Sequence, residues 1–310
     1  IVGLRKTRFL IVGALALLAA GCSSLHKPGA VKIDPALETL VPSDTVFLLG
    51  ARIDRIRDTD IYRKYLSQTN PTQIQQFAQA TGIDPRKDLD EALACYNGKA
   101  GLLLIRGAFN KKYVERRLES RGAKPLAYKG IDMFGDERYS VALIDNSTAA
   151  AGNTATLKSA IGGRDRGNQG LPAALQTEVN NLGKDNQIWM ALTGGVPGIE
   201  AMTGAQGNLA NVIRILRGID NATAGLNLTN GLVLAARAEC RDDDAARHVH
   251  DALRGVIGIG RLSTPDSRPE LLKVYDAIQV NQDRQNVSVS ANLPPALVDS
   301  FADLLLKGRR

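Results

Sequence analysis

The chain runs twice through one order of predicted elements, and this repetition constrains its fold more than any other feature of the sequence. An apolar strand is predicted at the start of each pass, at residues 45–51 and 187–193. Each pass continues through helical residues to a hairpin centred on an Asn-Gly pair, Asn97-Gly98 in the first and Asn230-Gly231 in the second. Asn-Gly between apolar strands is a strong hairpin signal, because both central residues of a type I′ turn have positive φ.

Each hairpin precedes an amphipathic helix, predicted over residues 110–121 and 242–257 with Asn110 and Asp242 as N-caps. A second strand pair and a last helix close each pass, at 131–134, 139–144 and 154–161 in the first and at 278–281, 287–291 and 295–305 in the second. Hairpins followed by helices imply antiparallel sheets with helices packed on one face. We therefore predict an α+β fold of two similar hairpin-helix units, the alternative being a chance recurrence of common elements.

The N-terminal residues have the layout of a secretory signal. Arg5, Lys6 and Arg8 are positively charged, residues 9–20 are apolar, and small residues precede the cysteine of Ala20-Gly21-Cys22. The apolar run is shorter than the about 20 residues that a membrane-spanning helix needs. These features predict a cleaved signal rather than a membrane span.

Residues 1–24 resemble the lipobox of bacterial lipoprotein precursors. In that family the cysteine thiol receives a diacylglycerol, the signal is cut before it, and the new amine is acylated. The resemblance implies that Cys22 is the lipidation site and that acyl chains tether the mature chain to a membrane. By the same resemblance, Ser23 favours the outer membrane, facing the periplasm. The body loosely resembles uncharacterised lipoproteins with duplicated α+β units, a likeness that implies no activity.

Four segments follow from these features. We predict a lipoprotein signal peptide at residues 1–21, a lipidated N-terminus and tether at 22–43, a first α+β unit at 44–165 and a second at 166–310. The tether is predicted because this stretch is rich in proline and has little periodicity. The two units are divided near the Gly/Arg/Asp-rich residues 162–170, which we predict to be a linker.

The charge balance argues against a nucleic-acid partner. Of the 39 basic residues, three lie in the predicted signal, which leaves 36 basic and 32 acidic residues and a net charge of +4. Aromatic residues make up 5% of the chain, and its basic residues are spread along it. Nucleic-acid binding would need a concentrated basic face with interleaved aromatic residues. The expected partners are the membrane, through the anchor, and a protein of the cell envelope.

Cys95 and Cys240 have two interpretations. An oxidising compartment would permit a disulfide between them that ties the two halves of the chain together. Both cysteines also follow alternating apolar stretches, where a free thiol behaves as a small buried hydrophobic group. We favour free thiols, and the disulfide stays open.

We predict neither a metal site nor a cofactor. His248 and His250 are two residues apart on a predicted helix, so they point about 200° apart and cannot bind one ion. His26 lies in the predicted tether. The acidic run 242–244 begins a helix, where carboxylates are stabilised by the helix dipole.

No catalytic residues are predicted, because the sequence contains no Gly-x-Ser-x-Gly, His-Glu-x-x-His, Cys-x-x-Cys or Walker-type motif. A Gly-rich loop at Gly194, Gly195 and Gly198 is the candidate for a ligand or anion, since backbone N–H groups there could hold one. Asp132, Asp136 and Glu137 could pair as acid and base, although turn carboxylates are usually solvated.

These observations lead to three hypotheses of function. The first is a non-enzymatic, lipid-anchored envelope protein that binds a protein partner or acts as a scaffold. The second is a carrier or sensor of an apolar ligand, held in a cleft between the two units. The third is a hydrolase with an unrecognised site, for which His250, Asp132 and Asp136 are the candidates.

Overall fold

The computed structural model describes residues 29–67, 72–165, 170–196, 198, 215–264 and 269–307. The predicted signal peptide, His26 and the proposed lipidation site Cys22 lie outside the described residues. Across the described ranges, none of the helices has the length and apolar character that crossing a bilayer requires.

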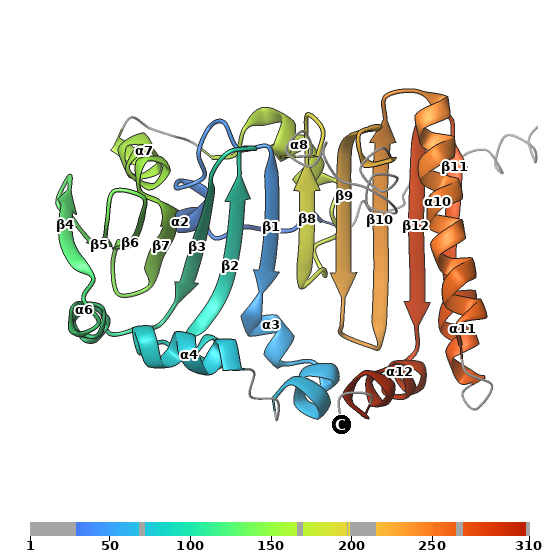
Figure 1. Ribbon diagram of the computed structural model, residues 1–310, viewed down its shortest axis with the longest axis horizontal. Coiled ribbons are helices and arrows are strands. Elements are labelled where there is room, and N and C mark those ends of the chain that lie inside the picture. The colour runs from blue at the N-terminus through green and yellow to red at the C-terminus, as the bar shows by residue number, and fades with distance from the viewer. Residues whose placement is uncertain are drawn as a thin grey trace, which may run out of the picture.

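The body is built on a single 12-stranded sheet in which neighbouring strands are antiparallel. The strands are β1 (Phe47–Arg52), β2 (Leu89–Tyr96), β3 (Gly101–Gly107), β4 (Lys124–Tyr128), β5 (Ile131–Gly135), β6 (Tyr139–Leu143), β7 (Thr148–Asn153), β8 (Ile188–Leu192), β9 (Ile219–Asn227), β10 (Leu232–Cys240), β11 (Ile278–Asp283) and β12 (Asn286–Leu293). Their order across the sheet is β11-β12-β10-β9-β8-β1-β2-β3-β7-β6-β5-β4 (Figure 1).

Helices lie along the sheet and below its lower end in the view of Figure 1. They are α2 (Pro35–Glu38), α3 (Ile53–Arg57), the π-helical η1 (Tyr62–Leu66), α4 (Thr72–Thr81), α5 (Pro85–Asp88), α6 (Lys111–Ser120), α7 (Thr154–Asp165), α8 (Ala173–Asn180), α10 (Asp243–Leu262), α11 (Glu270–Asp276) and α12 (Pro295–Lys307). Asn110 and Asp242 cap their helices as predicted, accepting hydrogen bonds from the backbone N–H groups of Tyr113 (3.0 Å) and Ala245 (2.7 Å).

Helices lie on both faces of the sheet around β1 and β3, whereas one face was predicted; along β10 and β11 the side opposite α10 is exposed. Leu48 of β1 is opposite Ala191 of β8, and both belong to the core that contacts α2, α7 and α8; we call this side the α2 face. The next pair, Leu49 and Met190, points to the other side, the α10 face. There α10 packs near β12, while α6 packs over Ile105 of β3. Because the strands carry apolar residues on both sides, both faces need cover.

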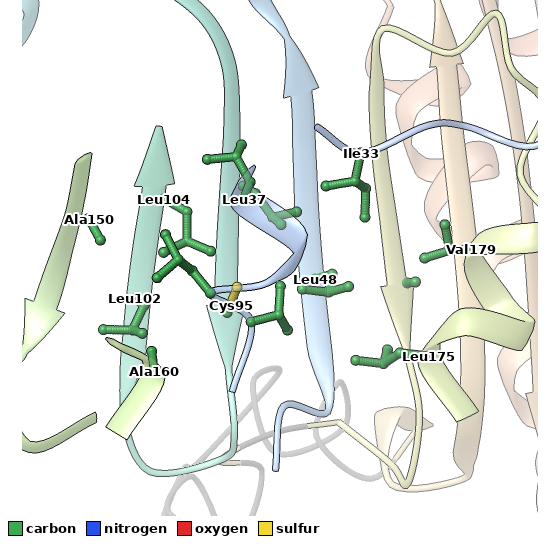
Figure 2. Close-up of a cluster of buried hydrophobic side chains, with 14 of the residues drawn as sticks. Ile33, Leu37, Leu48, Cys95, Leu102, Leu104, Ala150, Ala160, Leu175 and Val179 are labelled. Carbon is green, nitrogen blue, oxygen red and sulfur yellow. The ribbon is translucent and has the colours of Figure 1, made fainter. Parts of the chain in front are cut away.

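The central core lies on the α2 face, and the chain's N-terminal residues are part of it. Residues from both predicted units contribute, including Leu48 of the first and Leu175 of the second. Figure 2 shows side chains from β1, β2, β3, α2 and α8 gathered over this part of the sheet. Within the stretch predicted as a tether, Val31, Ile33, Leu37, Leu40 and Val41 are buried. The apolar side chains of this stretch follow no helical or strand period, so their burial could not be predicted from the sequence pattern.

The sheet is continuous across the predicted boundary between the units. β1 pairs with β8, from Phe47 opposite Leu192 to Ala51 opposite Ile188. Outward from this pair, one direction runs through β2 and β3 to β7 and β6, and the other through β9 and β10 to β12 and β11. Gly162 and Gly163, predicted as linker, belong to α7; the linker residues 166–169 lie outside the described residues.

Both Asn-Gly hairpins form, but neither has the predicted type I′ turn. Four residues separate the strands in each, and in each turn it is the glycine, Gly98 or Gly231, that has positive φ. Asn97 instead accepts hydrogen bonds through its side chain from the N–H groups of Lys99 and Ala100. The turn between β4 and β5 has two consecutive residues of positive φ, at Lys129 and Gly130.

Candidate functional site

The predicted glycine loop follows β8. Gly194, Gly195 and Gly198 all have positive φ, between 71° and 87°. The N–H of Gly195 donates to the carbonyl of Asp220 at 2.8 Å, so this amide is committed to the backbone rather than to a ligand. Several other residues of the loop lie outside the described residues, and the ligand role of the loop stays a prediction.

The predicted acid, base and metal candidates lie apart from one another. His250 contacts the neighbouring Asp251 carboxylate at 2.9 Å, and His248 is exposed. Asp132 pairs with Lys111 at 2.8 Å, and Asp136 accepts hydrogen bonds from the turn that follows it. In the parts of the chain that the structure describes, no three His, Cys, Asp or Glu side chains gather as a metal site requires.

Cys95 and Cys240 are free, buried thiols. They lie in separate apolar clusters, on strands with β9, β8 and β1 between them. Four strand spacings amount to about 19 Å, whereas a disulfide needs Cα atoms less than about 7 Å apart. The structure therefore has no bridge at these positions. Burial raises the pKa of the Cys95 thiol to about 12, which keeps it protonated and unreactive.

An apolar pocket of about 330 Å³ lies between α10 and the α10 face of the sheet. Its floor consists of small side chains on two neighbouring strands: Ala222 and Ala224 on β9 are opposite Ala238 and Ala236 on β10. Valine or leucine at these positions would fill the space under a packed helix; four alanines leave it open. Alternate alanines in two paired strands are the sequence signal for this pocket.

The walls of the pocket are almost wholly apolar. Met190 of β8 and Val289 of β12 flank the floor, and Val249, Leu253 and Val256 of α10 line the side toward β11. An apolar cavity holds hydrocarbon in preference to water, and its volume is at the lower end of the roughly 300–1,000 Å³ of small-molecule pockets. The arrangement suits one aliphatic chain.

The pocket opens beside an exposed apolar stripe on α10. Val256 lines the pocket and is nevertheless 69% exposed, so it lies at the mouth. Ile259, one turn further along, is 66% exposed, and Leu262 is 89% exposed. These residues extend the apolar surface from the mouth toward the C-terminal end of α10. The helix predicted over residues 242–257 continues to Leu262, and Val256 is its last residue to line the pocket.

A second, more polar pocket of about 440 Å³ lies between the two predicted units on the α2 face. Glu91 of β2 lines it and is 5% exposed, because it takes an inward-facing position of the strand in phase with Leu93 and Cys95. Its carboxylate accepts a hydrogen bond from the N–H of Asp34 at 3.3 Å and lies 3.8 Å from Arg52. The contacts fasten the N-terminal residues to the sheet.

Some groups around Glu91 raise the pKa of its carboxyl, and others lower it. Burial raises its pKa to about 7, and the nearby Asp34 and Asp54 carboxylates act in the same direction. Arg52 and the N–H of Asp34 lower this pKa, but by less than burial raises it. No histidine lines this pocket among the described residues, and the Glu91 carboxylate is held by the N–H of Asp34 and by Arg52, so the geometry supports a fastening role better than acid–base chemistry.

Comparisons with known proteins give no family. No protein-family model matches the chain, and no curated protein sequence matches it significantly. Among solved structures, crystal forms I, III and IV of TP0453 are similar, at 11%, 10% and 10% sequence identity and TM-scores of 0.44, 0.48 and 0.47. Each alignment covers 88% of this chain, and 98%, 98% and 97% of the TP0453 chains respectively. The chain is thus distantly similar in structure to TP0453.

Proposed function

We propose that the protein is a lipid-anchored, non-enzymatic envelope protein that carries an apolar ligand. The observation that supports the proposal is the apolar pocket under α10, with its alanine floor and its mouth at Val256. The predicted cleft between the two units is instead the polar pocket of Glu91, and the apolar pocket belongs to residues 166–310.

The size of the pocket indicates weak, exchangeable binding. A chain of about eight methylenes would gain roughly 6 kcal/mol on burial. Association costs at least about 4 kcal/mol, so little net affinity is left. Weak binding suits a carrier that must also release its ligand.

Displacement of a fluorescent naphthylamine probe by fatty acids of increasing length tests ligand binding. Ala236→Leu fills the floor of the pocket and should abolish probe uptake while leaving the fold intact, since filling a cavity rarely destabilises. Ala235→Leu is the matched control, because Ala235 is exposed and points to the opposite side of β10. Equal probe binding by both variants would overturn the proposal.

The anchor is tested separately. Metabolic labelling with a fatty-acid analogue should mark the parent chain and leave Cys22→Ser unmarked. An unmarked parent that fractionates away from membranes would remove the envelope assignment, and with it the outer-membrane location.

Docking of a protein partner is the second candidate, and the exposed stripe of Ile259 and Leu262 on α10 favours it. Ile259→Asp should lose a specific companion that co-purifies with the parent in mild detergent. Val233→Asp, at an exposed apolar position on β10, should retain it. Retention by both variants would exclude this surface.

Duplication is the interpretation we propose for the strand order. It is supported by the matching order on either side of the β1–β8 pair, in which β7 and β6 take the places of β12 and β11. This differs from the match predicted from the sequence, which set residues 131–134 (β5) against β11 and residues 139–144 (β6) against β12. The hairpin of β4 and β5 is then an insertion in the first unit. Superposition of the two halves in an experimental structure should pair β2 with β9 and β3 with β10.

A further inference from the structure

A second concave site, which we call the basic cleft, lies where the N-terminal residues meet the start of β8. Ala30 forms an antiparallel bridge with Gly183, and the N–H of Lys184 donates to the carbonyl of Gly29 at 2.6 Å. The end of β1 joins the same place, since the N–H of Arg52 donates to the carbonyl of Gln187 at 2.7 Å. These contacts enclose a cleft of about 500 Å³.

Four basic residues from different parts of the chain line the basic cleft, with one acidic residue, Asp185, among them. Arg52 is neutralised by Asp54 at 2.7 Å. The other three, Lys32, Arg55 and Lys184, have no ion-pair partner among the described residues, and Arg55 donates to the backbone carbonyl of Lys184 at 3.1 Å. Like charges that line one concavity repel one another and create a positive potential there. A bound anion would reduce this repulsion.

The position of the basic cleft along the chain identifies the anion. Gly29 lines the cleft and follows Cys22 by seven residues, which span at most about 25 Å when fully extended. If Cys22 is acylated, as the proposed function requires, the cleft is held within that distance of the membrane surface. Anionic lipid headgroups are the phosphates most concentrated there, and basic residues are attracted to them over a Debye length.

We propose that the basic cleft binds the phosphate of an anionic phospholipid headgroup in the leaflet that holds the anchor. The cleft is separate from the apolar pocket, and the two share no lining residue. The anchor sets the distance of the body from the membrane, and the cleft sets its orientation.

The test uses the full chain in neutral detergent micelles to which phosphatidylglycerol is added, with binding followed as a rise in the unfolding midpoint. The triple variant Lys32→Gln, Arg55→Gln, Lys184→Gln should bind about a hundredfold more weakly, because each basic residue near an anionic lipid surface contributes roughly a factor of five. The control triple Lys99→Gln, Lys112→Gln, Arg116→Gln removes the same charge from exposed positions in the β2–β3 turn and on α6. It should bind as the parent does; an equal loss would mean that net charge acts alone, and would overturn the proposal.

Two further measurements separate the sources of the effect. Glycerol phosphate has no acyl chain for the apolar pocket and should compete with phosphatidylglycerol for the parent chain. If glycerol phosphate binds and phosphatidylglycerol gives no response, the ligand is a soluble phosphate and the headgroup assignment is wrong. Cys22→Ser should keep the response in micelles, which supports the cleft even if the anchor itself fails its labelling test.

Discussion

Glu91 is a carboxyl group at an inward-facing strand position, where an apolar residue is usual. The side chain is buried because it fastens Asp34 and the residues around it to the sheet, and burial raises its pKa to about 7. The folded protein therefore holds a proton on Glu91 at pH values where the unfolded chain, with a pKa near 4.5, has released it. Its contribution to stability is complete below pH 4.5 and is lost as the pH rises through 7.

Glu91→Gln should remove this pH dependence. The variant keeps a neutral side chain at every pH, so relative to the parent its free energy of unfolding should rise between pH 4.5 and 7. The rise is at most roughly 3 kcal/mol, from 1.36 kcal/mol for each unit of pKa shift. Urea unfolding at pH 5 and pH 8 measures it. Parallel pH profiles for the two proteins would show that Glu91 titrates normally.

Gly50 is required by its neighbour Trp189. The two residues are directly opposite in β1 and β8, and a Cβ on Gly50 would overlap the indole ring. Gly50→Ala should destabilise the protein by about 1–3 kcal/mol, the usual cost of overpacking. Trp189 is the one tryptophan of the chain, so its fluorescence reports the shift directly. Gly101→Ala is the control, because a Cβ there would meet its nearest atom at 3.5 Å, an ordinary contact, and unfolding should be nearly unchanged.

At the scale of the element, α10 carries three glycines with different surroundings. A Cβ on Gly255 or Gly258 would meet no atom within 4 Å, whereas one on Gly260 would overlap the ring of Tyr275. Gly255→Ala and Gly258→Ala should each stabilise the protein by about 1 kcal/mol, because alanine favours the helix. Gly260→Ala should destabilise it. Thermal unfolding of the three variants compares them within one helix, and an equal response from all three would contradict the packing at Tyr275.

Elements with a strong period or a turn signal could be predicted from the sequence, and elements held by tertiary contacts could not. The two Asn-Gly hairpins and the capped helix α10 are confirmed. The strand β7 was missed because Ala149, Ala150 and Ala151 have low strand propensity and gain their place through pairing with β3. The pocket was missed for a related reason, since an alanine floor becomes a cavity only through the elements that pack beside it, here α10.

At the scale of the whole molecule, one core joins both predicted units. Leu37, from residues predicted to be a tether, is fully buried among side chains of β1, β2, β3 and α8. A chain whose two halves share a core should unfold as one cooperative unit. The residues on either side of the predicted boundary between 165 and 166 therefore pack into the same core.

Leu37→Ala should reveal this shared core. Truncating a buried leucine costs about 2–5 kcal/mol, and strands of both halves should lose protection against hydrogen exchange together. Leu49→Ala, on the α10 face and 43% exposed, should cost clearly less. Two separate transitions in Leu37→Ala would mean that the halves fold independently.

The order of the strands leaves the sheet open, with β4 at one end and β11 at the other. An unpaired edge is a template for aggregation, and the danger grows when chains are crowded on a surface. Two residues of β4 disfavour such pairing. The charge of Lys124 repels a second copy of the chain, and Pro125 has no N–H to donate to an incoming strand. At the other end, α10 and α11 lie beside β11 (Figure 1). Each edge strand of the sheet thus has a feature that disfavours pairing with the sheet of a second chain.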